Sequence, residues 1–449
     1  MISLKLSELA VAVGCAPPSR DLEINTIVSD SRKARPGCLF AALPGTHFDG
    51  HDFADAAVTL GASALLLERL LENDAPQLIV DDVLQALGKI AALLRNRLDP
   101  EVIGITGSNG KTTVKEMVAS ILRLEGEVLA TQGNFNNELG LPLSLFELEE
   151  KHRYAVLEMG ASKSGDIGYL AQIARPDIGL VNNIASAHLE GFGSEEGVAR
   201  TKGELFASLP SSGWAVMNAD EPWLDIWREM NTAGNTITFG AGAGSDVRVE
   251  ENKNGGRINT PDGSFDLQLA LPGGHNLINA AAATAIALAL GINMEIIRQG
   301  LERVEPVPGR LNLLHTAAGW TVIDDTYNAN PASLYSALQV LARIPGEPWL
   351  VLGDMKELGT DSSKMHREVG ENARVMGVRR LLATGEMSMH TVDAFGPGAE
   401  HFGSRDGLIE ALCRDIRPGV NCLVKGSRSM GMESVVEAIV QESEMREAS

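Results

Sequence analysis

The stretch "EVIGITGSNGKTTVKEM", Glu101 to Met117, decides the fold of this chain. It opens with a short apolar run, which is typical of a buried parallel strand, and it ends with apolar residues at helical spacing. A glycine turn joins the two parts. The unpaired N–H groups at the start of a helix attract anions, so this order of elements is typical of a phosphate-binding loop.

The glycine turn departs from the standard phosphate-loop pattern G-x-x-x-x-G-K-[ST]. Ile105 stands where the first glycine belongs, and Gly107 comes two residues later. A chance glycine turn is the alternative, but the full string between a strand and a helix disfavours it. We therefore predict a nucleotide site in which Lys111 reaches the β- and γ-phosphates and Thr112 ligates Mg²⁺. The predicted loop residues are Gly107, Ser108, Asn109, Gly110, Lys111, Thr112 and Thr113.

Composition and charge limit the classes of function. The chain has 449 residues, 44% of them hydrophobic and 22% charged, which is ordinary for a soluble protein. The formal net charge of -21 argues against nucleic acid or an anionic membrane as a partner. Any anionic ligand must therefore be held by local positive groups.

Cysteine usage and the N-terminal segment indicate a cytoplasmic protein. The four cysteines lack C-x-x-C spacing and are expected to be buried free thiols in a reducing compartment. The first apolar run is interrupted by Glu8 and follows no basic region, so it does not resemble a signal peptide. No run of ~18 apolar residues is present to span a membrane.

The alternation of elements predicts three α/β domains, at 1–82, 83–310 and 311–449. The first mixes short β-like runs with an alanine-rich stretch. In the second, strands alternate with helices, which indicates a mainly parallel sheet with hairpin material added near 252–271. Two prolines and a glycine make 305–310 a linker candidate. The third domain is expected to be Rossmann-like.

Several polar residues leave two interpretations open when taken alone. Glu158 ends an apolar strand and suits Mg²⁺, yet an exposed strand-end glutamate is equally good. Lys202 alone is typical of a solvated helix lysine, and a lone His188 is more often structural than a ligand. Asn276 is a good helix N-cap. Asn330 before a proline can also cap a helix without any other function.

The shortened loop, with Asn109 before Gly110, resembles that of the Mur ligase family. These are the ATP-dependent, amide-bond-forming enzymes of peptidoglycan precursor synthesis, and folylpolyglutamate synthases are related to them. The resemblance covers essentially the whole chain and implies binding of ATP with two Mg²⁺ ions. It further implies that Glu158 and His188 bind metal. Lys202 would be carbamylated by CO₂, which turns a cation into an anionic oxygen donor.

The resemblance also implies which residues meet the rest of the nucleotide. Asn279 is expected to face the adenine, with His275 and Asn276 as neighbours. Asp325 is expected near the ribose, and Asn328 belongs to the same segment of the C-terminal domain. An arginine at the position of Arg310 approaches the γ-phosphate in this family when that domain closes.

Three strings indicate which reaction within the family to expect. "SDSRKARPGCLFAALPGTHFDGHDF" resembles the domain that holds a UDP-sugar, with Ser31 and Arg32 as candidates. "VLGDMKELG" and "KGSRSMGME" resemble the members that join D-alanyl-D-alanine to UDP-N-acetylmuramoyl-tripeptide. Lys356 stands where an apolar residue is expected, which is a small departure. We expect a monomer with these two substrates as its partners.

The peptide substrates carry carboxylates, which need cationic partners. Asp354, Lys425 and Arg428 are candidates for contacts with these peptides. The alternatives are a related ligase that adds the third peptide residue, a folylpolyglutamate synthase, and a nucleotide-driven switch without ligation. The strings in the third domain disfavour the first two. Measuring phosphate release with and without the dipeptide distinguishes a ligase from such a switch.

Overall fold

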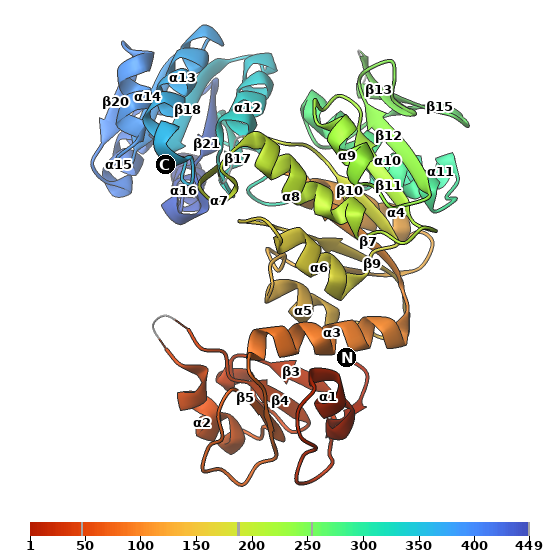
Figure 1. Ribbon diagram of the computed structural model, residues 1–449. Helices are drawn as coiled ribbons and strands as arrows, with labels where there is room; N and C mark the ends of the chain where they lie inside the picture. Colours follow the sequence, from red (N-terminus) through yellow and green to blue (C-terminus); the bar gives the residue numbers. More distant parts are fainter. Residues whose placement is uncertain (46–47, 186–188, 253–254, 448–449) are drawn as a thin grey trace.

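The computed structural model describes residues 1–45, 48–185, 189–252 and 255–447. It confirms the predicted fold class of three α/β domains. Figure 1 shows the N-terminal domain at the bottom, the central domain above it and the C-terminal domain at the upper left. Every helix among the described residues is too short or too polar to span a lipid bilayer. All four cysteines are free, as predicted, but Cys15 and Cys413 are only partly buried.

The N-terminal domain consists of a two-stranded and a four-stranded sheet with short helices. Its elements are β1 (Leu4–Lys5), α1 (Leu6–Val13), β2 (Glu23–Ile24), β3 (Thr26–Val28), η1 (Ser31–Lys33), β4 (Cys38–Ala41), η2 (Gly50–Phe53), α2 (Ala54–Thr59), β5 (Ala64–Leu67) and β6 (Gln77–Ile79). Strands β3 to β6 pair in sequence order and run parallel. The helix α3 (Val83–Leu98) follows directly, and Asp82 caps it by accepting from the Gln85 N–H.

The central domain is built on a nine-stranded sheet. Its strands are β7 (Glu101–Thr106), β8 (Glu127–Ala130), β9 (His152–Glu158), β10 (Ile178–Val181), β11 (Trp214–Asn218), β12 (Asn235–Gly240), β13 (Val247–Asn252), β14 (Gly255–Thr260) and β15 (Gly263–Leu267). The sheet order is β15-β14-β13-β12-β11-β10-β7-β9-β8. All pairs are parallel except those of β14 with β13 and β15, so both the parallel sheet and the added hairpins are confirmed.

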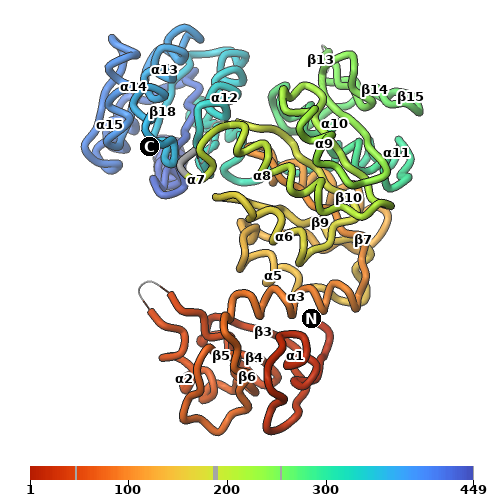
Figure 2. Tube along the Cα trace, viewed as in Figure 1, coloured from red at the N-terminus to blue at the C-terminus, as the bar shows by residue number. Residues whose placement is uncertain are grey.

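Helices cover both faces of this sheet. They are α4 (Lys111–Leu122), α5 (Gly140–Leu145), α6 (Asp166–Ala174), α7 (Leu189–Phe192), α8 (Glu195–Ala207), α9 (Leu224–Met230), α10 (Gly274–Ala289) and α11 (Met294–Glu302). α4 and α10 share an apolar core on one face. On the other face, α5 and α6 pack with α3 in a core that continues into the N-terminal domain. Figure 2 shows α3 lying between the two domains, so shared apolar burial fixes their junction.

The C-terminal domain has a six-stranded sheet of order β16-β17-β21-β18-β19-β20. Its elements are β16 (Asn312–His315), β17 (Thr321–Asp325), α12 (Pro331–Arg343), β18 (Glu347–Gly353), η3 (Gly359–Asp361), α13 (Ser362–Val375), β19 (Arg380–Thr384), α14 (Ser388–Phe395), β20 (Ala399–Phe402), α15 (Arg405–Asp415), β21 (Val420–Lys425), η4 (Arg428–Met430) and α16 (Glu433–Glu447). Only β16 pairs antiparallel, at one edge. The carboxyl ends of the parallel strands form the edge where α/β proteins bind ligands.

Candidate active site

The phosphate loop joins β7 to α4, as the sequence predicts, and its glycines are required by the space around them. Gly107 and Gly110 have positive φ angles of 151° and 79°. A Cβ on Gly110 would lie 2.5 Å from Asn182 Nδ2 and 2.6 Å from Asn279 Oδ1. No side chain fits there without displacing these amides. The backbone conformation of the loop therefore depends on glycine.

Asparagines at the end of β10 hold the loop from behind. The N–H groups of Ser108 and Asn109 donate to the carbonyl and to Oδ1 of Asn183, at 2.9 and 2.8 Å. The Asn182 amide donates to the Asn109 carbonyl at 3.0 Å and to Asn279 Oδ1 at 2.9 Å. Neither Asn182 nor Asn183 was predicted from the sequence. Their position at the carboxyl end of a strand beside β7 was the available signal.

Lys111 lies over the loop that it follows. Its Nζ donates to the Gly107 carbonyl at 2.7 Å. Burial lowers the pKa of Lys111, Glu158 opposes this shift, and Arg310 adds to it. The amine thus faces the loop in a partly desolvated setting, where a phosphate would gain more from the charge than in water.

Glu158, at the end of β9, is bound to the first turn of α4. Its Oε2 accepts from Thr112 Oγ1 at 2.9 Å, and its Oε1 accepts from Asn136 Nδ2 at 2.7 Å. Its backbone N–H donates to Thr131 Oγ1 at 3.0 Å. Only 3% of Glu158 is exposed, so the interpretation as an exposed strand-end residue is wrong. Asn136 was not predicted, because its loop carries no strong pattern.

Lys202 on α8 is buried near Glu158, with 4% of the residue exposed. Burial is the main cause that places the pKa of Lys202 well below its usual range, and Lys111 adds to the shift. The interpretation as a solvated helix lysine is therefore wrong. A neutral amine is the form that reacts with CO₂, which fits the predicted carbamylation. His188 lies outside the described residues.

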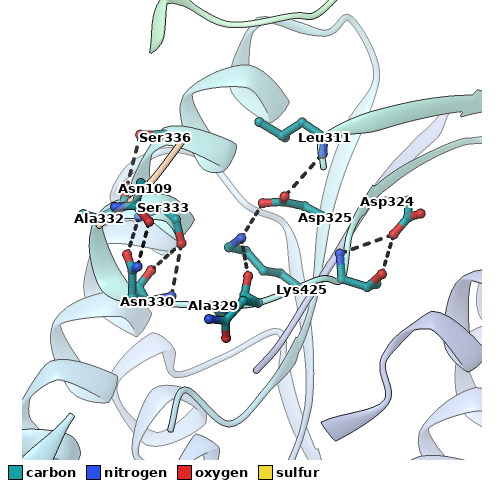
Figure 3. A network of polar contacts seen from close by, with 12 residues as sticks. Asn109, Leu311, Asp324, Asp325, Ala329, Asn330, Ala332, Ser333, Ser336 and Lys425 are labelled. Atoms are coloured by element: carbon teal, nitrogen blue, oxygen red, sulfur yellow. Dashed lines mark hydrogen bonds and ion pairs between the residues drawn. The ribbon is translucent and has the colours of Figure 1, made fainter. Parts of the chain in front are cut away.

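Two side chains, one from the linker and one from the C-terminal domain, contact the phosphate loop. Arg310 Nη2 donates to Thr112 Oγ1 at 3.0 Å, and its guanidinium lies 3.8 Å from the centre of the Tyr327 ring. Asn330 Nδ2 donates to Asn109 Oδ1 at 2.8 Å (Figure 3). Asn330 also caps α12, as predicted, through the Ser333 N–H. Its cap role and its contact with the loop coexist.

Asp325 is buried beside Lys425, and the two form an ion pair (Figure 3). Burial raises the pKa of Asp325, while Lys425 acts in the opposite direction. The Lys425 amine also donates to the Asn328 carbonyl at 2.9 Å, and the Asn328 side chain accepts from the Ala329 N–H at 2.9 Å. Lys425 therefore faces the 325–329 segment inside the domain, which weakens its case as a contact for the peptide substrates.

A small pocket lies beside the phosphate loop, between α4, α10 and the linker. It is lined by Thr113, Glu116, Leu271, Asn276, Val304, Glu305, Val307 and Arg310. Asn276 does not cap a helix, because α10 begins earlier, after Gly273, and the Asn276 amide donates to the Pro272 carbonyl at 2.8 Å. Asn276 lines this pocket, whereas Asn279 lies against Gly110 of the phosphate loop.

Comparison with known proteins decides the family. Three family models match in order: "Mur ligase family, catalytic domain" at 23–95, "Mur ligase middle domain" at 105–287 and "Mur ligase, glutamate ligase domain" at 309–428. UDP-N-acetylmuramoyl-tripeptide--D-alanyl-D-alanine ligase of Escherichia coli (strain K12) is 44% identical, and the match covers 98% of this chain and 99% of that protein. The chain belongs to the Mur ligase family.

Solved structures of Mur ligases have the same three-domain fold. MurF from Acinetobacter baumannii superposes with a TM-score of 0.91 at 34% identity, covering 98% of this chain and 99% of the other. MurF from Thermotoga maritima, solved in complex with ADP, gives a TM-score of 0.86 at 32% identity, covering 94% and 98% of the two chains. The sequence-based assignment to the Mur ligase family is confirmed.

The remaining candidate residues of this Mur ligase lie in different settings. Asp354 has 1% of its surface exposed; its carboxylate accepts from the Ser388 N–H at 2.8 Å and pairs with Lys356 at 3.0 Å, so it binds the first turn of α14. Arg428 is largely exposed, 5.7 Å from the Tyr327 ring.

Ser31 and Arg32 form a short turn after β3 in the N-terminal domain. Arg32 pairs with Asp30 at 2.8 Å, and 86% of its side chain is exposed. Both residues lie in the domain predicted to hold the UDP-sugar, which leaves their assignment a prediction.

Proposed function

We propose that this Mur ligase joins D-alanyl-D-alanine to UDP-N-acetylmuramoyl-tripeptide at the expense of ATP. The products are UDP-N-acetylmuramoyl-pentapeptide, ADP and phosphate. Full-length similarity to relatives named for this reaction supports the proposal. The observation that carries it is the meeting of Lys111, Thr112, Glu158 and Arg310 around one phosphate loop.

The first step activates the free carboxylate of the tripeptide. One carboxylate oxygen attacks the γ-phosphorus of ATP, the bond to the bridging oxygen breaks, and ADP leaves with that electron pair. Phosphoryl transfer depends mostly on positioning and on neutralising charge. The loop N–H groups and Lys111 would bind the phosphates on one side. Arg310, delivered from the linker, would face them from the other.

The residues around Thr112 fit Mg²⁺. Among the described residues, the side-chain oxygens of Glu158 accept hydrogen bonds only from the neutral groups of Thr112 and Asn136. A buried carboxylate without a bonded cation suits a hard metal ion with oxygen ligands. We propose that Thr112, Glu158, His188 and carbamylated Lys202 hold two ions. Bound there, Mg²⁺ would neutralise charge on the transferred phosphoryl group.

In the second step, the dipeptide amine attacks the acyl carbon of the acyl phosphate. The resulting tetrahedral intermediate collapses, the C–O bond to phosphate breaks, and the nitrogen loses a proton as the amide forms. Water must be excluded, since it would hydrolyse the acyl phosphate. The contacts of Arg310 and Asn330 with the loop support a closed arrangement in which the C-terminal domain covers this site.

The proposal assigns a task to each domain. Residues 1–82 would bind the UDP-sugar, residues 83–310 ATP, and residues 311–449 the incoming dipeptide. Asp325 and Asn328 would lie on the ribose side of the nucleotide, and Asn276 and Asn279 on the side of the base. We further propose a cytoplasmic monomer, which gel filtration with light scattering would test.

A coupled assay of ADP release tests the function. The purified protein is given ATP, Mg²⁺, UDP-muramoyl tripeptides with diaminopimelate or lysine at position three, and D-alanyl-D-alanine. ADP release that requires both the tripeptide and the dipeptide is expected, with the pentapeptide product seen by mass spectrometry. ATP hydrolysis that ignores the dipeptide would favour a nucleotide-driven switch instead.

A further inference from the structure

The residues on either side of Arg310 have an unusual backbone conformation. Gly309 and Leu311 both have positive φ angles, of 73° and 53°. For leucine this left-handed conformation is rare and costs stability, so the surrounding contacts must hold it in place. Strained backbone conformations cluster at functional sites, where a side chain must be held in one position, and the residue between these two is Arg310.

Three hydrogen bonds fasten this turn to the end of β17. The Gly309 N–H donates to Asp324 Oδ2 at 3.0 Å, and the Tyr327 N–H donates to the Gly309 carbonyl at 3.1 Å. The Leu311 N–H donates to Asp325 Oδ1 at 3.3 Å (Figure 3). The backbone of Arg310 therefore moves with the C-terminal domain, while its side chain reaches the central domain.

The guanidinium of Arg310 has one hydrogen bond and one ring contact among the described residues. Its carbon lies 3.8 Å from the centre of the Tyr327 ring, and Nη2 reaches Thr112. Its Nε is buried and has no hydrogen-bond partner among the described residues. Without the ring, few contacts would keep this long side chain aimed at the phosphate loop.

We propose that Tyr327 is a positioning residue that aims Arg310 at the transferred phosphoryl group. When the C-terminal domain docks, Tyr327 therefore determines where the positive charge of Arg310 lies relative to the phosphoryl group. This inference rests on the function proposed above. Tyr327 acts through Arg310, and its hydroxyl group is not required, because the contact is made by the face of the ring.

Steady-state kinetics of ring variants test this role. Tyr327→Leu should lower kcat roughly 2- to 30-fold, the range that a cation–π contact supports, with the KM for the tripeptide unchanged. Tyr327→Phe should keep kcat within about twofold. The matched control is Tyr335→Leu, since Tyr335 lies on α12 in the same domain and is 47% exposed. It should leave kcat unchanged.

Two further measurements separate positioning from a general structural effect. In an Arg310→Gln background, Tyr327→Leu should cause no additional loss, because the cation that the ring contacts is already gone. Phenylalanines of increasing fluorination at position 327 keep the shape of the ring but weaken its attraction for cations. With them, kcat should fall stepwise.

Equal kcat across the fluorinated series, or full additivity with Arg310→Gln, would overturn the role of Tyr327 while ligation itself stands. The fluorinated series also decides the question if Tyr327→Leu fails to fold. A wild-type protein that releases no ADP with both substrates would instead remove the proposed function, and this inference with it.

Discussion

The hydrogen bond between Asn330 and Asn109 tests how the C-terminal domain contacts the phosphate loop, because this contact can be removed without removing the helix cap. Asn330 Oδ1 caps α12 by accepting from the Ser333 N–H at 2.8 Å, while its Nδ2 donates to Asn109 Oδ1 at 2.8 Å. Asn330→Asp retains the acceptor for the cap but places an oxygen against Asn109 Oδ1. The variant should therefore lose the domain contact and keep the helix.

The magnitude follows from the two interactions. A lost neutral hydrogen bond costs about 0.5–1.5 kcal/mol, so kcat/KM for ATP should fall roughly 2- to 12-fold. Aspartate is as good an N-cap as asparagine, so the free energy of unfolding should change by less than about 0.5 kcal/mol. Asn330→Ala removes both interactions and should cost about 1 kcal/mol of stability in addition.

The assay pairs ADP-release kinetics with urea unfolding for both variants, each also made in an Asn109→Ala background. In that background, Asn330→Asp should lose most of its kinetic effect, because the contact is already absent. If Asn330→Asp ligates at the wild-type rate while remaining folded, the contact does not contribute to the reaction. The domain arrangement argued from it would then be refuted.

Three other outcomes follow from the site. Lys111→Ala should abolish ligation with an unchanged circular dichroism spectrum, and normal turnover would remove the phosphate-loop assignment. Lys202→Ala should be inactive and should regain activity with short carboxylic acids. The activity of the wild type should instead depend on bicarbonate. Wild-type activity of the variant would end the carbamylation proposal. Burial, with Lys425 nearby, lowers the pKa of His275 to about 4. Because the folded state disfavours protonation of the His275 imidazole, up to about 3 kcal/mol of stability should be lost as pH falls from about 6.5 to about 4. In urea titrations, His275→Asn should flatten this part of the curve of stability against pH.

Much of the fold could be predicted from the sequence because its helices, strands and turns depend on local patterns of residues. The strand, glycine turn and helix at 101–122 were predicted from apolar spacing and from residues that favour turns. The hairpins that follow β12 and the cap at Asn330 were also predicted correctly. The antiparallel edge strand β16 was not, because four residues with mixed burial carry no clear period.

Side-chain environments were the weaker part of the sequence analysis. Glu158 and Lys202 left a solvated interpretation open, and the structure shows both buried. Asn276 suited a cap by its position near a helix start, yet it lies inside the helix. Asn136 gave no signal of its own, and the strand-end position of Asn182 and Asn183 did not reveal their partners, which are tens of residues away along the chain.

The order of residues thus determined the helices, the parallel strands, the glycine-dependent loop and the family, since each depends on neighbours within a few positions or on a motif. Only the tertiary structure decided which charges are buried together, that Arg310 reaches Thr112, and that Asn330 meets Asn109 across 221 positions. These contacts join separate domains, and burial and pairing at that range depend on packing that no local pattern records.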